Sequence, residues 1–117
     1  MTRDFPEYRN QIKALMAQLR QEMPDTMKGF GALHAASMKG GAIDEKTKEL
    51  IALGIGIGAR CDGCIAFHTH EALAGGATRQ EVLETISVAI SMGGGPSLMY
   101  GLHALEALDQ FSDTKGA

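Results

Sequence analysis

The sequence predicts an all-α protein that folds as a single bundle of about six helices. Apolar residues recur every three or four positions along most of the chain, which is the spacing of one face of a helix. Clusters of glycine and proline divide the chain into about six segments of this kind. A length of 117 residues corresponds to one domain, so we expect a single domain over residues 1–117.

Two helices are expected in the first forty residues. The first carries apolar residues at helical spacing over residues 5–19, with Pro6 near its start. Pro24 then interrupts the pattern. A second apolar stripe occupies residues 27–38 and stops at the pair Gly40-Gly41.

The third helix is expected to begin after Asp44, a favourable N-cap residue, and to continue toward Arg60. It contains Gly54, Gly56 and Gly58, each of which costs a helix about 1 kcal/mol relative to alanine. The alternating run at residues 54–58 could also form a strand, but the chain contains no second strand-like run to pair with it. The three glycines therefore suggest the close approach of another helix or of a bound group.

Three further helices are expected after residue 60. The first of them ends at the glycine pair 75–76, and Thr78 with Glu81 forms a capping box before the next. The run Met-Gly-Gly-Gly-Pro at residues 92–96 ends that helix. Ser97 is expected to cap the last helix, and the tail after Ser112 is expected to fray.

The composition limits the cellular setting and the partners. With no tryptophan and seven methionines, the core is expected to consist of Leu, Ile, Ala and Met, and to gain from burial between subunits. A net charge of -3 gives no broad attraction to nucleic acid or to anionic lipid. The N-terminus has no apolar leader, and the longest uncharged stretch is about half a membrane span. We expect a cytoplasmic protein without nucleic-acid or membrane partners.

Cys61, Cys64 and His68 carry the clearest chemical signal. These are the only two cysteines, and in a reducing compartment such a pair is usually catalytic or metal-binding. On a helix the three residues fall on one face. The spacing fits a redox dithiol with its own acid and base. It also fits most of a zinc site, completed by Glu49 or His70.

Glu49 is the next candidate, twelve residues before Cys61. In one straight helix these positions would lie about 18 Å apart. They can meet only if the chain reverses near residues 60–62, so that two helices pack side by side. The carboxyl group would then enter a largely apolar interface, where its pKa would rise and it could carry a proton near neutral pH.

Together these residues form the pattern E-x11-C-x2-C-x3-H, which resembles the motif of the alkylhydroperoxidase D-like proteins of the carboxymuconolactone decarboxylase superfamily. The resemblance covers roughly residues 30–108, with the motif region at 44–76. It implies an all-α fold that assembles into trimers or hexamers. It also implies thiol-dependent reduction of peroxides or disulfides, with no cofactor and no resident metal.

The resemblance assigns a role to each of the four residues. Cys64 would be the peroxidatic cysteine, Cys61 its resolving partner and proton donor, and Glu49 with His68 the proton relay. The helix dipole alone favours Cys61 as the nucleophile, because it is nearer the helix start. The substrate would be a peroxide or a disulfide, and a separate thiol or protein reductant would restore the dithiol. The best-known peroxidase members carry a histidine where this chain has Gly63, which implies a weak peroxidase.

Other interpretations stay open at this point. The chain could be a zinc-binding module, a carboxymuconolactone decarboxylase-like protein without redox activity, or an oligomeric scaffold with a vestigial site. The decarboxylases generally lack the cysteine pair. His34 and His103 fit satisfied core or interface positions, and His70 fits a surface or interface position. The remaining basic side chains of interest fit solvated helix faces: Lys46, Lys48 and Arg79.

Overall fold

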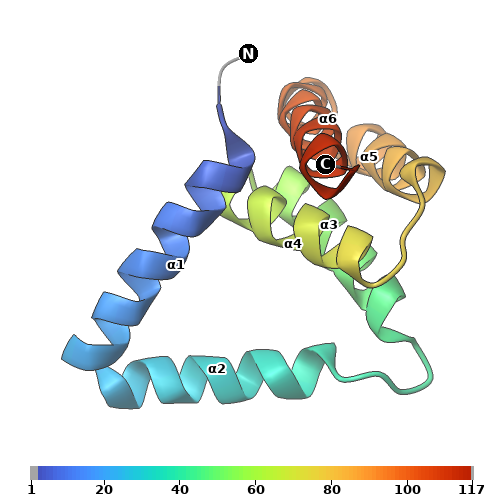
Figure 1. The fold of residues 1–117 in the computed structure, drawn as a ribbon. Helices are drawn as coiled ribbons and strands as arrows, with labels where there is room; N and C mark the ends of the chain where they lie inside the picture. Colours follow the sequence, from blue (N-terminus) through green and yellow to red (C-terminus); the bar gives the residue numbers. More distant parts are fainter. Residues whose placement is uncertain (1–2, 117) are drawn as a thin grey trace.

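The computed structural model describes the backbone of residues 3–116 and the side chains as far as Ser112. Its six helices are α1 (Phe5–Glu22), α2 (Pro24–Met38), α3 (Glu45–Gly58), α4 (Asp62–Ala74), α5 (Arg79–Gly93) and α6 (Gly95–Gly116) (Figure 1). No strand occurs in this part of the chain. The predicted all-α fold with six helices is confirmed.

Two of the predicted helix starts are formed by the expected side-chain caps. The Asp44 carboxylate accepts a hydrogen bond from the Thr47 amide at 2.7 Å, at the start of α3. At the start of α5, the Glu81 amide donates to the Thr78 hydroxyl at 3.1 Å. The Thr78 amide in turn donates to the Glu81 carboxylate at 2.8 Å, which completes the capping box.

The last helix differs from the expectation at its start. It begins at Gly95 rather than after Ser97, because Pro96 is tolerated in the first turn of a helix. Ser97 is buried and lies inside the helix. The helix extends to Gly116, since no glycine or proline interrupts residues 102–115. Fraying of the tail after Ser112 stays a prediction.

The hydrophobic core lies among α3, α4, α5 and α6, and α1 contributes one buried side chain to it, Phe5. The core consists of Leu, Ile, Val, Ala and Phe side chains, and the largest fully buried ones include Leu53, Ile57, Ile65 and Leu108. The prediction that methionines fill this core is wrong. Each methionine described is half-buried or exposed, because it lies on the α1–α2 segment or on an outer face that no other helix of the chain covers.

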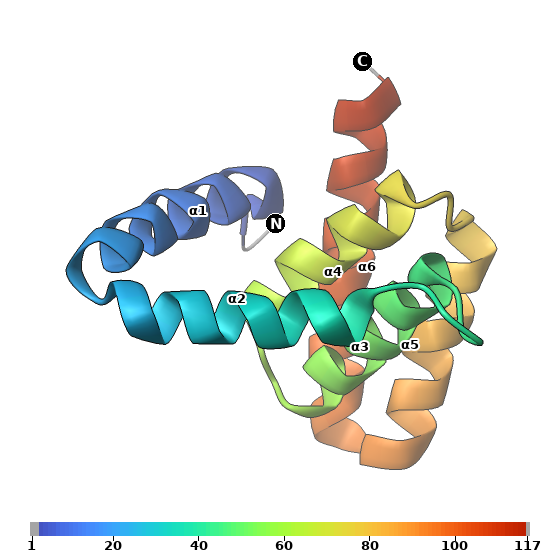
Figure 2. The ribbon, with the colours of Figure 1, turned by 90° about the horizontal axis from the view of Figure 1, so that it is seen from below.

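Helices α1 and α2 form an arm that extends away from α3–α6 (Figures 1 and 2). None of the α2 residues is buried. Large apolar side chains such as Leu15, Phe30 and Leu33 are more than half exposed on this arm. The arm therefore leaves apolar surface open to solvent within a single chain.

Among residues 3–116, no helix is both long and apolar enough to cross a membrane.

Candidate dithiol site

The site depends on a tight reversal between α3 and α4. Arg60 adopts a left-handed backbone conformation, with φ of 59°, and the Cys61 amide donates to the Gly56 carbonyl at 2.9 Å. A Cβ atom at Gly56 would lie only 2.9 Å from the Cβ of Cys64. The chain therefore reverses where the sequence predicted, and Gly56 is the glycine that permits the closest approach of the two helices.

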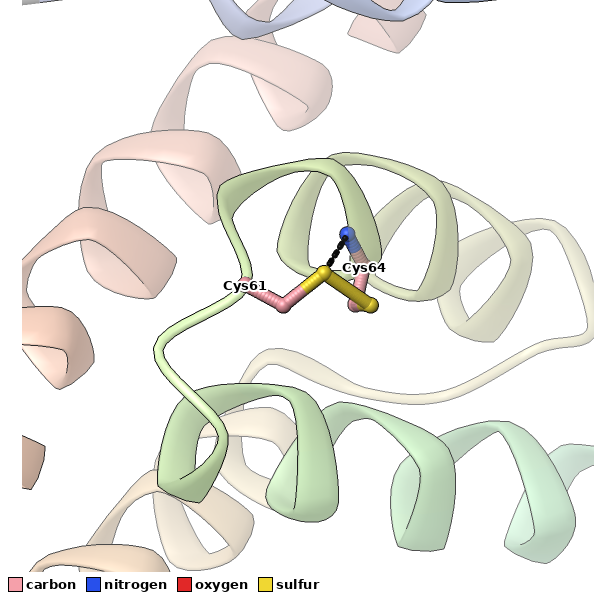
Figure 3. The surroundings of a disulfide bond; sticks show 2 residues. All are labelled: Cys61 and Cys64. Carbon is pink, nitrogen blue, oxygen red and sulfur yellow. Dashed lines mark hydrogen bonds between the residues drawn. A yellow bond between two sulfur atoms is a disulfide. The ribbon is translucent and has the colours of Figure 1, made fainter. Parts of the chain in front are cut away.

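Cys61 and Cys64 are joined by a disulfide at the start of α4 (Figure 3). Their Cα atoms are 5.2 Å apart, a usual separation for a disulfide. Cys61 is also the N-cap of α4, and its sulfur accepts a hydrogen bond from the Cys64 amide at 3.1 Å. Both sulfurs thus lie at the positive end of a helix dipole, where a thiolate is stabilised.

Glu49 and His68 form a direct pair across the α3–α4 interface. The Glu49 Oε1 atom lies 2.7 Å from His68 Nδ1, and the two side chains are 16% and 17% exposed. A carboxylate at this nitrogen fixes the orientation of the ring and leaves Nε2 for a second partner. In the disulfide form, neither sulfur exchanges a hydrogen bond with His68 within the described residues.

Solvent can reach this pair from the side of α2. Glu49 lines a cavity of about 390 Å³ together with Glu45 and three residues at the end of α2 and just beyond it, Ala35, Met38 and Lys39. His34 contributes a ring whose centroid is 6.0 Å from that of His68. His34 is exposed on the arm, which excludes the core position of the two that were predicted, and an interface position stays a prediction.

Sequence reasoning missed a second pair beside the cysteines. His103 Nδ1 lies 2.7 Å from Asp62 Oδ1, and Arg3 Nε lies 3.5 Å from Asp62 Oδ2. His103 is satisfied by a partner, as predicted, but its side chain is 35% exposed and does not belong to the core. An interface position stays a prediction. The signal that could have revealed the pair is the acidic residue within the Cys-x-x-Cys segment, which needs a partner from another element.

The other predicted surface residues make specific contacts. His70 is half-exposed, as expected, and its Nδ1 lies 2.9 Å from the Glu71 carboxylate. The three basic residues predicted to lie on solvated faces each hold a partner. Their partners are the Glu81 carboxylate for Lys46, the backbone carbonyls at positions 37 and 39 for Lys48, and the Asp109 carboxylate for Arg79.

The residues considered for a zinc site are not brought together in the part of the chain that the structure describes. There, no group of three or more His, Cys, Asp or Glu side chains is placed to hold a metal ion. Cys61 and Cys64 hold each other in the disulfide, and Glu49 holds His68.

Comparison with known proteins identifies the family of the chain and supports the helical fold. A model of the carboxymuconolactone decarboxylase family matches residues 24–107. The chain belongs to this family. Two relatives are 36% identical to it. An uncharacterized protein of Cupriavidus necator matches over 109 residues, 93% of this chain and 96% of that protein. An uncharacterized protein of Haemophilus influenzae matches over 107 residues, 92% of this chain and 95% of that protein.

Solved structures of the carboxymuconolactone decarboxylase family share the fold over nearly the whole chain. One from Legionella pneumophila is 48% identical with a TM-score of 0.90, and the match covers 92% of this chain and 96% of that one. Another, from Thermotoga maritima, is 26% identical with a TM-score of 0.81. That match covers 97% of this chain and 94% of the Thermotoga chain. The Thermotoga protein is described as possibly involved in antioxidative response. The recognition made from the motif is thereby confirmed.

Proposed function

We propose that this carboxymuconolactone decarboxylase family protein is a thiol-dependent oxidoreductase that cycles between a Cys61–Cys64 dithiol and a disulfide. One observation carries the proposal. A disulfide-forming pair lies at a helix N-terminus, and a half-buried Glu49–His68 pair lies on the same two helices. The antioxidative role suggested for the Thermotoga relative supports a peroxide as the substrate class.

The peroxide reaction balances with these four residues. The Cys64 thiolate attacks the terminal oxygen of a hydroperoxide, the O–O bond breaks, and Cys64 becomes a sulfenic acid. The departing alkoxide takes a proton and leaves as the alcohol. Cys61 then attacks the Cys64 sulfur, water leaves, and the disulfide forms. Two thiols have supplied two electrons, and an external thiol or protein reductant must return them.

The Glu49–His68 pair is suited to move the protons. An imidazole one helical turn after Cys64 can accept the proton of the thiol and return it to the alkoxide. The carboxylate holds the ring in one orientation and stabilises the imidazolium that forms between these steps. The cavity that borders Glu49 connects the pair to the surface beside α2.

Reduction of a disulfide substrate uses the same groups. A thiolate of the pair attacks the substrate sulfur, one substrate thiolate leaves, and a mixed disulfide forms. The other cysteine then attacks its partner and releases the second thiol. Gly63 favours this reaction over rapid peroxide reduction, because it leaves the motif without the histidine of the best-known peroxidases.

The test compares Cys64→Ser with Cys61→Ser. Pre-reduced proteins are mixed with hydrogen peroxide, an organic hydroperoxide or a model disulfide, and product and thiols are counted. Cys64→Ser should consume no peroxide. Cys61→Ser should reduce one equivalent and stop as a sulfenic acid that a specific trap captures. Full turnover by Cys64→Ser would overturn the proposal. Stoichiometric zinc in the purified protein, with no free thiol, would favour a metal-binding module instead.

A further inference from the structure

A second titratable pair, Asp62 and His103, lies beside the dithiol. Asp62 is the first residue of α4 and follows Cys61 directly, and its side chain is 17% exposed. Its Oδ1 atom lies 2.7 Å from Nδ1 of His103, which comes from α6. Its Oδ2 atom lies 3.5 Å from Arg3 Nε, which precedes α1. Two parts of the chain far apart in sequence therefore converge on the residue beside Cys61.

The charge of this cluster depends on one imidazole. Arg3 and Asp62 carry opposite charges that cancel, so the cluster is neutral when His103 is neutral and carries one positive charge when His103 is protonated. Histidine is the side chain whose ordinary titration falls within the physiological range. The His103 side chain is 35% exposed, so it can exchange its proton with solvent.

Other titratable and charged groups near the pair come from α6, from α1 and from the segment before α1. The Tyr100 ring lies 4.7 Å from the His103 ring on the same helix. The Arg3 guanidinium lies 4.1 Å above the Tyr8 ring of α1. Glu106 lies one turn beyond His103 on α6 and is buried.

The motif leaves a place for such a pair. A Cβ atom at Gly63 would meet the Ile12 side chain at 3.4 Å and the Tyr8 hydroxyl at 4.0 Å, so this position faces α1. No imidazole is supplied from within the Cys-x-x-Cys segment. His103 brings an imidazole to this segment from another helix, by its contact with the Asp62 carboxylate.

We propose that Asp62 and His103 form a pH-sensitive pair that controls the charge beside Cys61, and so sets how readily Cys61 reacts and departs as a thiolate. The proposal rests on the dithiol function proposed above. When the thiolate of a reductant attacks Cys64, the S–S bond breaks and Cys61 takes the bonding electrons. A second reductant thiolate then releases Cys64, so two reductant thiols become one disulfide. A protonated His103 stabilises the departing Cys61 thiolate, and a bare Asp62 carboxylate opposes it.

The test isolates Cys61 in a Cys64→Ser background and measures its alkylation rate against pH. For a generic separation of about 7 Å, one unit charge corresponds to about a threefold change in thiolate population in bulk water, and to about a fiftyfold change at the effective dielectric near a protein surface. The expected change lies between these limits. His103→Asn should lower the rate by a factor in this range below neutral pH. Asp62→Asn should raise it by a similar factor. The two changes have opposite signs, which a purely structural role of the pair would not produce.

A matched control lies on the same helix. His70 is about as exposed as His103 and pairs with Glu71 at 2.9 Å, but it lies more than two turns from Cys61 along α4. His70→Asn should leave the alkylation profile unchanged. The inference is overturned if the alkylation rate of Cys61 depends on pH in the same way in the parent, in His103→Asn and in Asp62→Asn. If Asp62→Asn does not fold, the comparison of His103→Asn with the parent decides the inference. Alkylation needs no peroxide or disulfide turnover, so failure of the proposed function is separately visible.

Discussion

Gly56 packs against Cys64 at a position between α3 and α4 that only glycine fits. We predict that Gly56→Ala destabilises the protein by about 1–3 kcal/mol, because the added methyl group would lie 2.9 Å from the Cys64 Cβ and force the helices apart. Urea unfolding of the oxidised protein measures this loss.

Gly58→Ala is the control for that prediction. It lies in the same helix, and no atom is within 4 Å of the added methyl group. This variant should be neutral or slightly stabilising, because alanine is the better helix former. Equal stability of the two variants would show that the α3–α4 contact is looser than described.

Glu49 is the residue whose role depends most on its surroundings. Glu49→Gln keeps the size of the side chain but removes the charge that faces His68 at 2.7 Å. We predict that kcat/KM for the same substrate falls by about 100-fold, the lower end of the rate enhancement that general acid–base catalysis supplies. The pH–rate profile should also change. Steady-state kinetics between pH 5 and 9 test it.

Glu45→Gln serves as the comparison for Glu49→Gln. Glu45 lines the same cavity but is exposed in the first turn of α3. The Glu45→Gln variant should retain the activity and the pH–rate profile of the parent. An unchanged profile for Glu49→Gln as well would remove Glu49 from the proton relay.

At the scale of elements, Glu71 joins α4 to α1 through an ion pair with Arg9. Burial raises the pKa of Glu71, but hydrogen bonds from His70 and Arg9 lower it by more, so the folded value lies below the ordinary 4.5. A depressed carboxyl pKa adds stability above the unfolded value, and this contribution is lost as the pH falls through the folded value. Glu71→Gln should therefore lower Tm at pH 7 by a few degrees at most, since solvent screens the pair.

The difference in Tm between the parent and Glu71→Gln should shrink as the pH falls below 4.5. Glu84→Gln is the control, because Glu84 is an exposed carboxylate whose hydrogen bond comes from a neutral amide, Gln80. A Tm difference for Glu71→Gln that grows in acid would contradict the assigned direction of the pKa.

Local sequence signals predicted those element boundaries that depend on one residue's own chemistry. Asp44 and Thr78 cap helices as expected, because an N-cap needs only a side-chain oxygen near its own backbone. Ser97 does not cap the last helix, because Pro96 is itself compatible with a first helical turn and the helix begins at Gly95. The Glu49–His68 pair was predictable because both residues flank one reversal. The Asp62–His103 pair was not, because α6 is placed by tertiary packing.

At the scale of the whole molecule, the outer face of α3 and α5 is open and apolar. A cavity of about 680 Å³ on this face is lined by no charged side chain. Its lining includes Ile55, Val88 and Met92, which are 67%, 64% and 84% exposed. We propose that a second copy of this chain covers this face, because an uncharged surface of this kind favours an apolar partner and the motif resemblance implies a trimer or hexamer.

Light scattering at micromolar concentration should then give a trimer or hexamer. Val88→Glu, which places a charge on this face, should shift the protein toward a monomer. Gln80→Glu, on the exposed first turn of α5 and outside the cavity, should not. A monomeric parent protein would contradict the proposal.

The stoichiometry of oxidation by a hydroperoxide tests the central claim most directly. Reduced protein is mixed with one equivalent of organic hydroperoxide, and free thiols, alcohol and protein mass are measured. The proposed function predicts the loss of both thiols per chain, one alcohol formed, and a mass lower by two hydrogens. Peroxide consumption without thiol loss, or two thiols that persist in the presence of peroxide and of a model disulfide, would contradict it.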